Sequence, residues 1–459
     1  MRALGYIFYN YLWIVFNVFL GYFYRANRRK NTSGLENVPK DRPVIFCSNH
    51  PNAFMDALML GSTIRRRTWF LARSDVFRKK LLAEFLGFIG IIPIYRLLEG
   101  AENLSKNDET FDKCSRMLSE NKSILVFSEG LCVQERRLRK LKKGTARIAL
   151  GTEEKNDFKL NLTIIPVGMN YSSTPWKFRK SLHVRFGEPY LVKDYEQVFR
   201  ENPAKGMTVF TRDLEERMKK LLVIIDDKAN DELVGQLEEM FLMEWAKEEY
   251  RDPRSQTETH HVSKEITYLL RECAEENPEE VNTLREKVAG YFRKIKAINT
   301  RDWVIRKMEA GKLNWAGVFF RYLIYILFLP VSIFGIITNY VPYKVPYLIA
   351  QKIVKNIEWH ASVNATIGIF LWQFWWLLQS LVVALVFRNW YILGAFMALV
   401  PITGILTEKF WILLRKTTGE ARMLLMKNKS EVVEEIFKTR NEISKEVYAL
   451  KAKFPLKQE

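Results

Sequence analysis

The string TIGIFLWQFWWLLQSLVVALVF, residues 366–387, carries no charged side chain over 22 positions. About 20 apolar residues in a helix are enough to cross the hydrocarbon core of a bilayer. The stretch therefore predicts a membrane-spanning helix, because a helix satisfies its own backbone hydrogen bonds in lipid. The alternative that the sequence leaves open is a soluble protein in which these residues form part of a buried pair of core helices.

Two further apolar segments flank this stretch within the hydrophobic region Trp315–Leu414. Tyr322–Tyr340 is uncharged and contains Pro330, and Tyr391–Thr407 follows the first stretch after only residues 388–390. So short a link is typical of a membrane hairpin. Seven of the 12 tryptophans fall in this region, and several lie near segment ends, where an aromatic belt is expected at the membrane surface. The sequence thus predicts a C-terminal region with up to three membrane segments.

The N-terminal segment Leu4–Tyr24 is also free of charge. A cleaved signal peptide is one reading, but the segment is long, aromatic and without a small-residue cleavage site. A retained anchor, which crosses the membrane or lies in its interface, is the expectation. Four basic residues follow the segment, whereas only Arg2 precedes it. The positive-inside rule then predicts that the next domain is cytoplasmic; the four are Arg25, Arg28, Arg29 and Lys30.

The chain has 71 basic and 52 acidic residues, a formal net charge of +19, so an anionic partner is expected. Nucleic acid is disfavoured because the basic residues are not interleaved with aromatic residues in one recognisable module. An anionic lipid surface accounts for both the charge and the apolar segments. The four cysteines show neither CxxC nor metal-ligand spacing, which predicts a reducing compartment and no metal site. No bound cofactor is expected.

Between Pro43 and Pro189, short apolar strands alternate with amphipathic helices. This alternation predicts an α/β domain with a largely parallel sheet flanked by helices, whose ligands bind beyond the carboxyl ends of the strands. Strands are expected at Pro43–Cys47, Thr68–Ala72, Ile91–Tyr95, Ser123–Phe127, Thr163–Gly168 and His183–Phe186. Helices are expected around Asp56–Ser62, Asp75–Leu86, Glu102–Glu120 and Thr145–Thr152.

Composition divides the whole chain into five segments. A membrane anchor with its basic flank occupies residues 1–30, and the α/β domain occupies 31–206. A charged helical region at 207–310 is expected to form a cover or arm. The hydrophobic membrane region at 311–414 and a charged helical tail at 415–459 complete the chain.

One string at a strand end pairs a histidine with a carboxylate. In SNHPNAFMD, residues 48–56, His50 and Asp56 are candidates for a general base and the group that orients it. Residues six positions apart cannot share one face of a regular helix. His50 is therefore expected in the loop after the strand, and Asp56 is expected to point back from the start of the following helix. A structural histidine before a helix would give the same string.

Three other strings follow at strand positions. GIIPIYR ends in Arg96, whose guanidinium suits phosphate recognition, although a surface arginine would also fit. SILVFSEG runs into Glu129 and Gly130, and the basic run 134–147 comes next. That run either attracts anionic substrates or forms a solvated helix face. IIPVG contains Pro166 and looks architectural.

In this order, the four strings resemble the glycerophospholipid acyltransferase family, which includes 1-acylglycerol-3-phosphate and glycerol-3-phosphate acyltransferases. The resemblance covers about residues 40–190. It implies that His50 is the general base and Asp56 its partner. It also implies that further residues bind the substrate or shape the site. The substrate-binding residues are Asn49, Arg96, Glu129 and Gly130, and the shaping residues include Pro166 and Gly144.

The chain departs from the family pattern in two places. Five residues separate His50 from Asp56 instead of the usual four, which looks like the variant of fungal-type glycerol-3-phosphate acyltransferases. The third string continues with Leu131 and Cys132 where the family commonly has threonine and arginine. Its phosphate-binding arginine is thus missing. Four nearby residues are candidates to replace it: Arg136, Arg137, Arg139 and Lys143.

The resemblance implies a membrane-bound enzyme that moves an acyl chain from a thioester of coenzyme A or acyl carrier protein. The acceptor would be a hydroxyl of glycerol-3-phosphate, lysophosphatidate or another lysolipid. A covalent acyl-enzyme on Cys47 or Cys132 stays conceivable, although the chain has no GxSxG elbow. The alternative from a different class is a non-catalytic lipid-binding or scaffolding protein with an acyltransferase-like fold.

Overall fold

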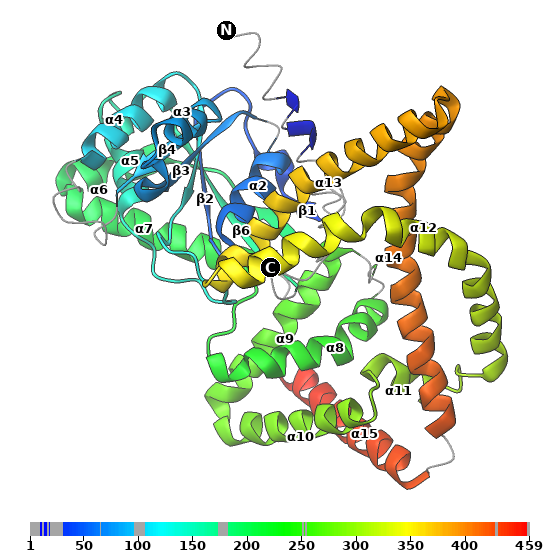
Figure 1. Ribbon diagram of the computed structural model, residues 1–459. Coiled ribbons are helices and arrows are strands. Elements are labelled where there is room, and N and C mark those ends of the chain that lie inside the picture. The colour runs from blue at the N-terminus through cyan, green and yellow to red at the C-terminus, as the bar shows by residue number, and fades with distance from the viewer. Residues whose placement is uncertain are drawn as a thin grey trace. The chain divides into compact units, whose positions relative to one another are not determined.

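The structure is a computed structural model (Figure 1). It describes residues 10, 11, 13–15, 18, 31–64, 66–95, 106–172, 182–249, 252, 255–426 and 430–456. Arg96, the basic flank 25–30 and most of the segment Leu4–Tyr24 lie outside these residues. The chain splits into two compact units. Unit 1 comprises Met1–Ile224, Ser255–His260 and Val354–Ser362, and unit 2 comprises Ile225–Arg254, His261–Ile353 and Val363–Glu459.

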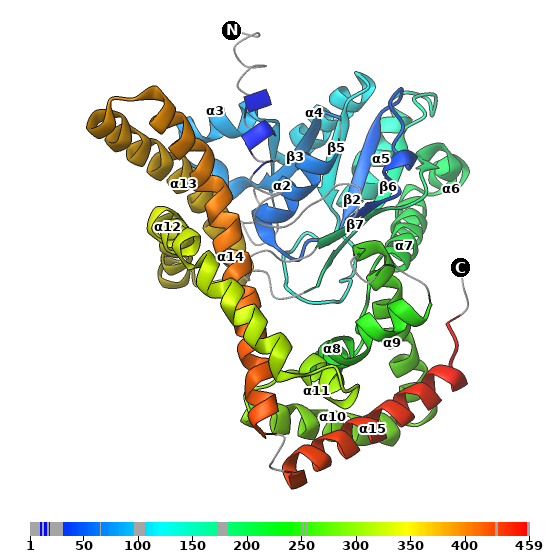
Figure 2. The ribbon, with the colours of Figure 1, turned by 90° about the vertical axis from the view of Figure 1, so that its right-hand side faces the viewer.

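An eight-stranded sheet forms the centre of unit 1 (Figure 2). Its order is β1-β7-β6-β2-β5-β3-β4, and β8 pairs with β6. All neighbours run parallel except that β7 and β8 run antiparallel to β6. The strands are β1 (Thr32–Ser33), β2 (Val44–Ser48), β3 (Thr68–Arg73), β4 (Ile91–Ile94), β5 (Ser123–Phe127), β6 (Thr163–Tyr171), β7 (Leu182–Phe186) and β8 (Tyr190–Leu191).

The register of the central strands determines where the site lies. Every residue of β2 is buried, as expected for a parallel strand covered on both faces. Ser48 at the end of β2 lies opposite Phe127 of β5 and Val167 of β6. The loops that follow β2 and β5, and the last residues of β6, therefore meet at one edge of the sheet.

Helices cover both faces of this sheet (Figures 1 and 2). On one face lie α4 (Lys106–Ser119), α5 (Gly144–Glu154) and α7 (Pro203–Leu221). Their apolar side chains form one core with alternate residues of the strands, such as Ile45 and Cys47 of β2. On the other face lies α2 (Ala53–Thr63), which begins five residues after β2 ends. Unit 1 also contains α3 (Lys80–Phe88) and α6 (Glu196–Glu201).

The expected fold class is confirmed: a largely parallel sheet is flanked by helices and followed by a helical C-terminal region. Local details differ from the sequence prediction. The expected helix from Asp75 is a short 3-10 turn, Ser74–Phe77, followed by α3. The basic run 134–147 is not one helix face, because residues 131–143 form a loop and α5 begins only at Gly144.

Charged helices of unit 2 pack around a core of their own. The helices are α8 (Asp231–Glu248), α9 (Gln256–Glu276, in unit 2 from His261 onward), α10 (Pro278–Ala297), α11 (Asp302–Glu309) and α15 (Ser430–Lys453). Trp245 of α8, Tyr291 of α10 and Ile436 of α15 are fully buried in this core. Most of residues 207–310 and of the tail form helices in the structure, and α7 belongs to unit 1.

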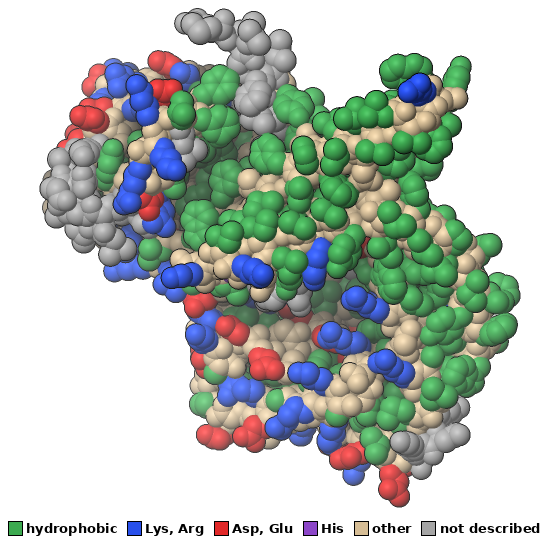
Figure 3. All heavy atoms as spheres, viewed as in Figure 1, with side chains coloured by type: hydrophobic (Ala, Val, Ile, Leu, Met, Phe, Trp, Pro, Cys, Tyr) green, Lys and Arg blue, Asp and Glu red, His purple; other side chains and the backbone are tan. Residues whose placement is uncertain are grey.

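Three helices of the described chain are long and apolar enough to cross a membrane. They are α12 (Trp315–Ile353), α13 (Ile357–Phe387) and α14 (Trp390–Met426). Only 17%, 11% and 22% of their most apolar windows are buried, and many hydrophobic side chains lie on the face of these helices that Figure 3 shows. A buried pair of core helices would hide these side chains from solvent, so the exposed faces favour a lipid environment.

The helices α12 and α14 approach each other closely at a glycine. A Cβ atom on Gly335 of α12 would lie 2.7 Å from the carbonyl oxygen of Thr403 in α14. Asn339 of α12 also donates to the carbonyl of Val400, at 3.1 Å. Small residues and interhelical hydrogen bonds of this kind stabilise helix pairs in lipid.

A buried ion pair joins the helices of unit 2. Arg440 of α15 is 4% exposed, and its Nε donates to Oδ1 of the fully buried Asp302 at 2.9 Å. The hydroxyl of Tyr291 donates to the same oxygen at 2.8 Å. Removal of one partner would leave the other charge buried and unpaired, which typically costs about 3–5 kcal/mol.

We therefore expect Arg440→Ala to lower the stability of unit 2 by roughly 3 kcal/mol. The control is Lys294→Ala, which breaks the more exposed pair with Glu435 and should cost less than about 1 kcal/mol. Hydrogen exchange of the amides in α10 and α15 measures both effects in the full chain. Equal protection in the two variants would contradict a stabilising role for the buried pair.

Candidate active site

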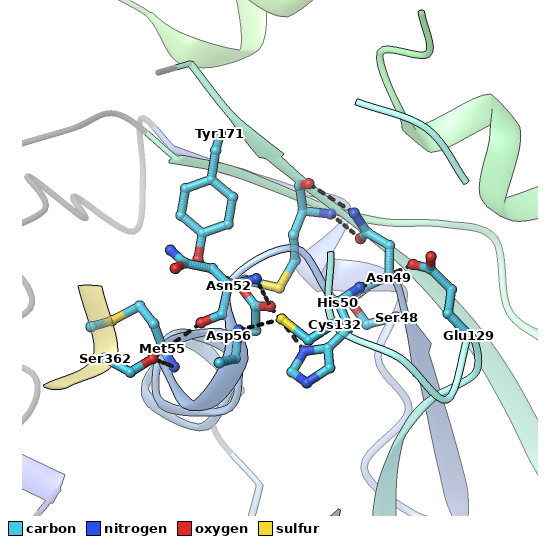
Figure 4. A network of polar contacts seen from close by, with 12 residues as sticks. Ser48, Asn49, His50, Asn52, Met55, Asp56, Glu129, Cys132, Tyr171 and Ser362 are labelled. Atoms are coloured by element: carbon cyan, nitrogen blue, oxygen red, sulfur yellow. Dashed lines mark hydrogen bonds and ion pairs between the residues drawn. The ribbon is translucent and has the colours of Figure 1, made fainter. Parts of the chain in front are cut away.

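A fully buried carboxylate, that of Asp56, lies at the centre of the site (Figure 4). Its Oδ2 atom is 3.0 Å from Nδ1 of His50 and accepts the backbone N–H of Asn52 at 2.7 Å. Its Oδ1 atom accepts the hydroxyl of Tyr171 at 2.7 Å. Three donor groups thus fix the positions of both oxygens of one carboxylate.

His50 follows β2, and the structure places it in the loop before α2, as the sequence predicts. An ionised carboxylate can only accept, so the contact with Asp56 puts the ring proton on Nδ1. The other nitrogen, Nε2, then carries the free lone pair of the neutral ring. The imidazole stacks on Phe127, with ring centroids 3.8 Å apart, and its side chain is 19% exposed. The ring is therefore held on one side and still accessible.

Glu129, two residues after the end of β5, joins two loops through its carboxylate. Its Oε1 accepts the backbone N–H of His50 at 3.1 Å, and its Oε2 accepts that of Arg139 at 3.3 Å. Burial raises the pKa of this carboxyl, and the two backbone donors oppose the shift. The next residue, Gly130, has φ +69°, a conformation that favours glycine. Glu129 thus sets the position of the histidine backbone.

The side-chain amide of Asn49 hydrogen-bonds the backbone of the neighbouring strand β6. Its Nδ2 donates to the carbonyl of Met169 at 3.1 Å, and its Oδ1 accepts the N–H of Met169 at 2.8 Å. Met169 belongs to β6, so this pair fastens the loop after β2 to the end of β6. Pro166 lies earlier in β6, opposite Cys47, and supports the same edge. Both residues thus lie where β2 and β6 run side by side, at the edge of the sheet that carries His50.

The basic loop 131–143 lies next to His50, since the N–H of Val133 donates to the carbonyl of His50 at 3.2 Å. Two of the arginines predicted to bind phosphate have an acidic neighbour: Glu135 is 3.5 Å from Arg137 and 3.2 Å from Arg139. Lys143 donates to Thr208 at 2.9 Å. Arg136 is partly buried in the same loop. The loop that carries these cations is therefore fastened to the backbone of His50 at Val133, while Arg96 lies outside the described residues.

The two cysteines near the site are poor nucleophiles. Burial raises the pKa of Cys132 to about 12, and the charge of Asp56 adds to the effect. Burial likewise raises the pKa of the fully buried Cys47 to about 12. The thiolate is the reactive form, so neither side chain is activated for attack at neutral pH. Cys132 instead accepts the N–H of Ala53.

Two site residues were not predicted from the sequence. Tyr171, at the end of β6, reaches Asp56 because β6 lies beside β2 in the sheet. Its aromatic side chain, three positions after Gly168, is the sequence signal that could have pointed to it. Ser362 contacts the start of α2 from a point more than 300 residues away along the chain, and no local pattern marks it. No cluster of metal-ligating side chains occurs among the residues that the structure describes.

Comparison with known proteins bears on this arrangement. Residues 29–170 match the family model described as Acyltransferase. Glycerol-3-phosphate O-acyltransferase 1 of Saccharomyces cerevisiae is 42% identical over 72 residues, which cover 16% of this chain and 9% of the yeast protein. The chain thus matches only a small part of that relative's length. The family model and the yeast match confirm the resemblance seen in the sequence, and residues 29–170 of this chain match an acyltransferase domain.

The 1-acyl-sn-glycerophosphate (LPA) acyltransferase PlsC of Thermotoga maritima is a further solved structure with some similarity. It is 18% identical, with a TM-score of 0.31, over 42% of this chain and 69% of that one.

The raised pKa of Glu129 predicts a pH-dependent stability. Between the ordinary glutamate pKa, about 4.3, and the raised value, the folded state keeps a proton that the unfolded state has lost. Wild-type stability therefore falls as the pH rises through this window. Glu129→Gln does not titrate and should escape this fall.

We expect the thermal midpoint of Glu129→Gln, relative to wild type, to increase from pH 4 upward through this window. Thermal unfolding of both proteins in detergent over a pH series measures the difference. A constant difference at every pH would show that Glu129 titrates normally in the folded protein.

Proposed function

We propose that this protein is a membrane-bound O-acyltransferase. It moves an acyl chain from the thioester of coenzyme A or acyl carrier protein to a hydroxyl of glycerol-3-phosphate or lysophosphatidate. The observation that carries the proposal is the His50–Asp56 pair, with its 3.0 Å contact and fully buried carboxylate, inside a domain that matches the acyltransferase family.

The proposed reaction uses His50 as a general base. Its Nε2 takes the proton of the acceptor hydroxyl as the oxygen attacks the thioester carbonyl. A carbon–oxygen bond forms, the carbon–sulfur bond breaks, and the leaving thiolate receives the proton from the imidazolium. Asp56 holds the ring and balances its charge during the step. The step needs neither a metal nor a covalent acyl-enzyme, and the raised pKa values of Cys47 and Cys132 fit this direct transfer.

The basic loop supports a phosphorylated acceptor. Arg136 and Arg137 lie three and four residues after Val133, whose N–H donates to the carbonyl of His50. A guanidinium can bind phosphate through two parallel hydrogen bonds. We propose that this loop takes the place of the arginine that is missing after Gly130. A phosphate bound there would put the neighbouring glycerol hydroxyl near the histidine.

Two features of the described chain support work at a membrane. The first is the set of three apolar helices, α12 to α14. The second is α3, where Leu81, Phe85 and Phe88 are 83%, 43% and 46% exposed and fall on one helix face. Arg78, Lys79 and Lys80 are exposed at its start. An apolar face beside basic residues is typical of a helix that lies in the membrane interface.

The side of the membrane on which the domain lies is also a proposal. The positive-inside rule, applied to the cluster 25–30, favours the cytoplasmic side. Acyl thioesters of coenzyme A and acyl carrier protein would then reach the domain from the cytosol.

The direct test is an assay of the purified protein in lipid vesicles. It combines acyl-coenzyme A or acyl carrier protein donors with glycerol-3-phosphate and lysophosphatidate acceptors. We expect turnover with at least one pair, and His50→Ala should lower kcat by about 10²–10⁴-fold because the general base is lost. The control is His261→Ala, in α9 of unit 2. Lysolipid binding without turnover in wild type would indicate a non-catalytic lipid-binding protein instead.

Substitution of the loop arginines tests the acceptor phosphate. Arg136→Ala and Arg137→Ala should raise the KM for the phosphorylated acceptor by roughly tenfold, since a hydrogen bond between charged groups is lost. The KM for the acyl donor should not change. The control is Lys140→Ala, an exposed cation of the same loop. Equal effects on both substrates would place the phosphate elsewhere.

A further inference from the structure

The start of α2 is capped by a residue that lies far away in the sequence. Asn52 occupies the N-cap position, and asparagine is among the best capping residues, yet its side chain accepts no backbone N–H. Met55, the third residue of the helix, donates its N–H to Oγ of Ser362 at 3.0 Å. The hydroxyl of Ser362 donates in turn to the carbonyl of Asn52 at 3.2 Å. Ser362 thus makes the contact that an N-cap side chain usually makes.

The same turn of α2 carries the charged partner of His50. Asp56 directly follows Met55, and it also accepts the N–H of Asn52. Between Asn52 and Asp56, the buried Ala53 has φ +43°, a left-handed conformation that is strained for alanine. Such a conformation persists only where surrounding contacts hold it. The bonds of Ser362 to Asn52 and Met55 bracket this strained residue (Figure 4).

The side-chain amide of Asn52 does not cap the helix that it precedes. Both of its polar atoms are fully buried, and neither has a hydrogen-bond partner among the residues that the structure describes. Figure 4 shows this amide turned away from the histidine ring. A turn that capped itself through Asn52 would need another backbone arrangement, so the observed geometry depends on an external hydroxyl.

Ser362 comes from the first turns of α13, in the part of that helix that belongs to unit 1. It is 2% exposed. A second contact fastens the same segment to the basic loop, since Gln134 donates to the carbonyl of Ile357 at 3.0 Å. Residues 354–362 therefore contact both the turn that carries Asp56 and the loop beside His50. They lie well outside the matched range 29–170.

We propose that Ser362 is a positioning residue for acyl transfer, which makes the start of α13 a structural component of the active site. This inference rests on the proposed function. The hydroxyl of Ser362 sets the first turn of α2, and that turn aims Asp56 at His50. Loss of the hydroxyl should disturb the dyad and leave the substrate contacts in place.

The test compares Ser362→Ala with Ser362→Thr in the full chain. The alanine variant should have a kcat roughly 10- to 100-fold below wild type, because small displacements of catalytic groups have effects of this size. Its KM values for donor and acceptor should stay within about twofold. The threonine variant keeps the hydroxyl and should recover most of the activity. The matched control is Ser380→Ala, a buried serine of the same helix whose Oγ has no partner in the described part of the chain.

A double-mutant cycle with Asp56→Asn separates positioning from general destabilisation. If Ser362 acts through Asp56, Ser362→Ala should have little further effect on kcat once Asp56 is replaced. Additive effects, or equal losses in the alanine and threonine variants, would overturn the inference. An inactive wild type refutes the proposed function itself. An active wild type with a fully active Ser362→Ala variant refutes only the positioning role.

Discussion

The carboxylate of Asp56 is the feature on which the site depends. It is fully buried, so its charge is tolerable only where donors surround it. The donors come from His50, the backbone of Asn52 and the hydroxyl of Tyr171. These groups belong to the loop after β2, the start of α2 and the end of β6. The buried charge of Asp56 is therefore stabilised only when the sheet register, the start of α2 and the tautomer of His50 together place all three donors around it.

Around this centre, other polar groups of the site hold the loops in place. Glu129 and Asn49 each use both polar atoms of the side chain to hydrogen-bond backbone groups of neighbouring segments. Such preorganisation is what a proton-transfer site needs, because a displacement of about 1 Å can cost 10²-fold in rate. The basic loop is fastened to the same frame, so a phosphate bound there would be placed relative to the histidine. The apolar helices and the exposed face of α3 would bring this frame to lipid substrates.

Much of this was predictable from local sequence. Continuous apolar runs with short helices between them predict the parallel sheet, and SNHPNAFMD predicts a histidine before a helix with Asp56 pointing back. The hydrogen-bond partners of the motif residues could not be predicted in this way, because a motif gives the type of each residue and not what it contacts. Glu129 and Asn49 match the family's substrate-binding positions, yet the structure occupies their polar atoms with backbone groups. Tyr171 and Ser362 reach the site through tertiary packing alone, which no local pattern encodes.

The central claim is that Nε2 of His50 removes the proton of the acceptor hydroxyl. The most direct measurement is an experimental structure of the full chain in a lipid nanodisc, with glycerol-3-phosphate and a non-transferable thioether analogue of the acyl donor bound. The account predicts one acceptor hydroxyl at hydrogen-bond distance from Nε2, about 2.6–3.2 Å, with the carbonyl carbon of the analogue beside it. An acceptor bound with every hydroxyl beyond the reach of His50, directly or through one water, would contradict it.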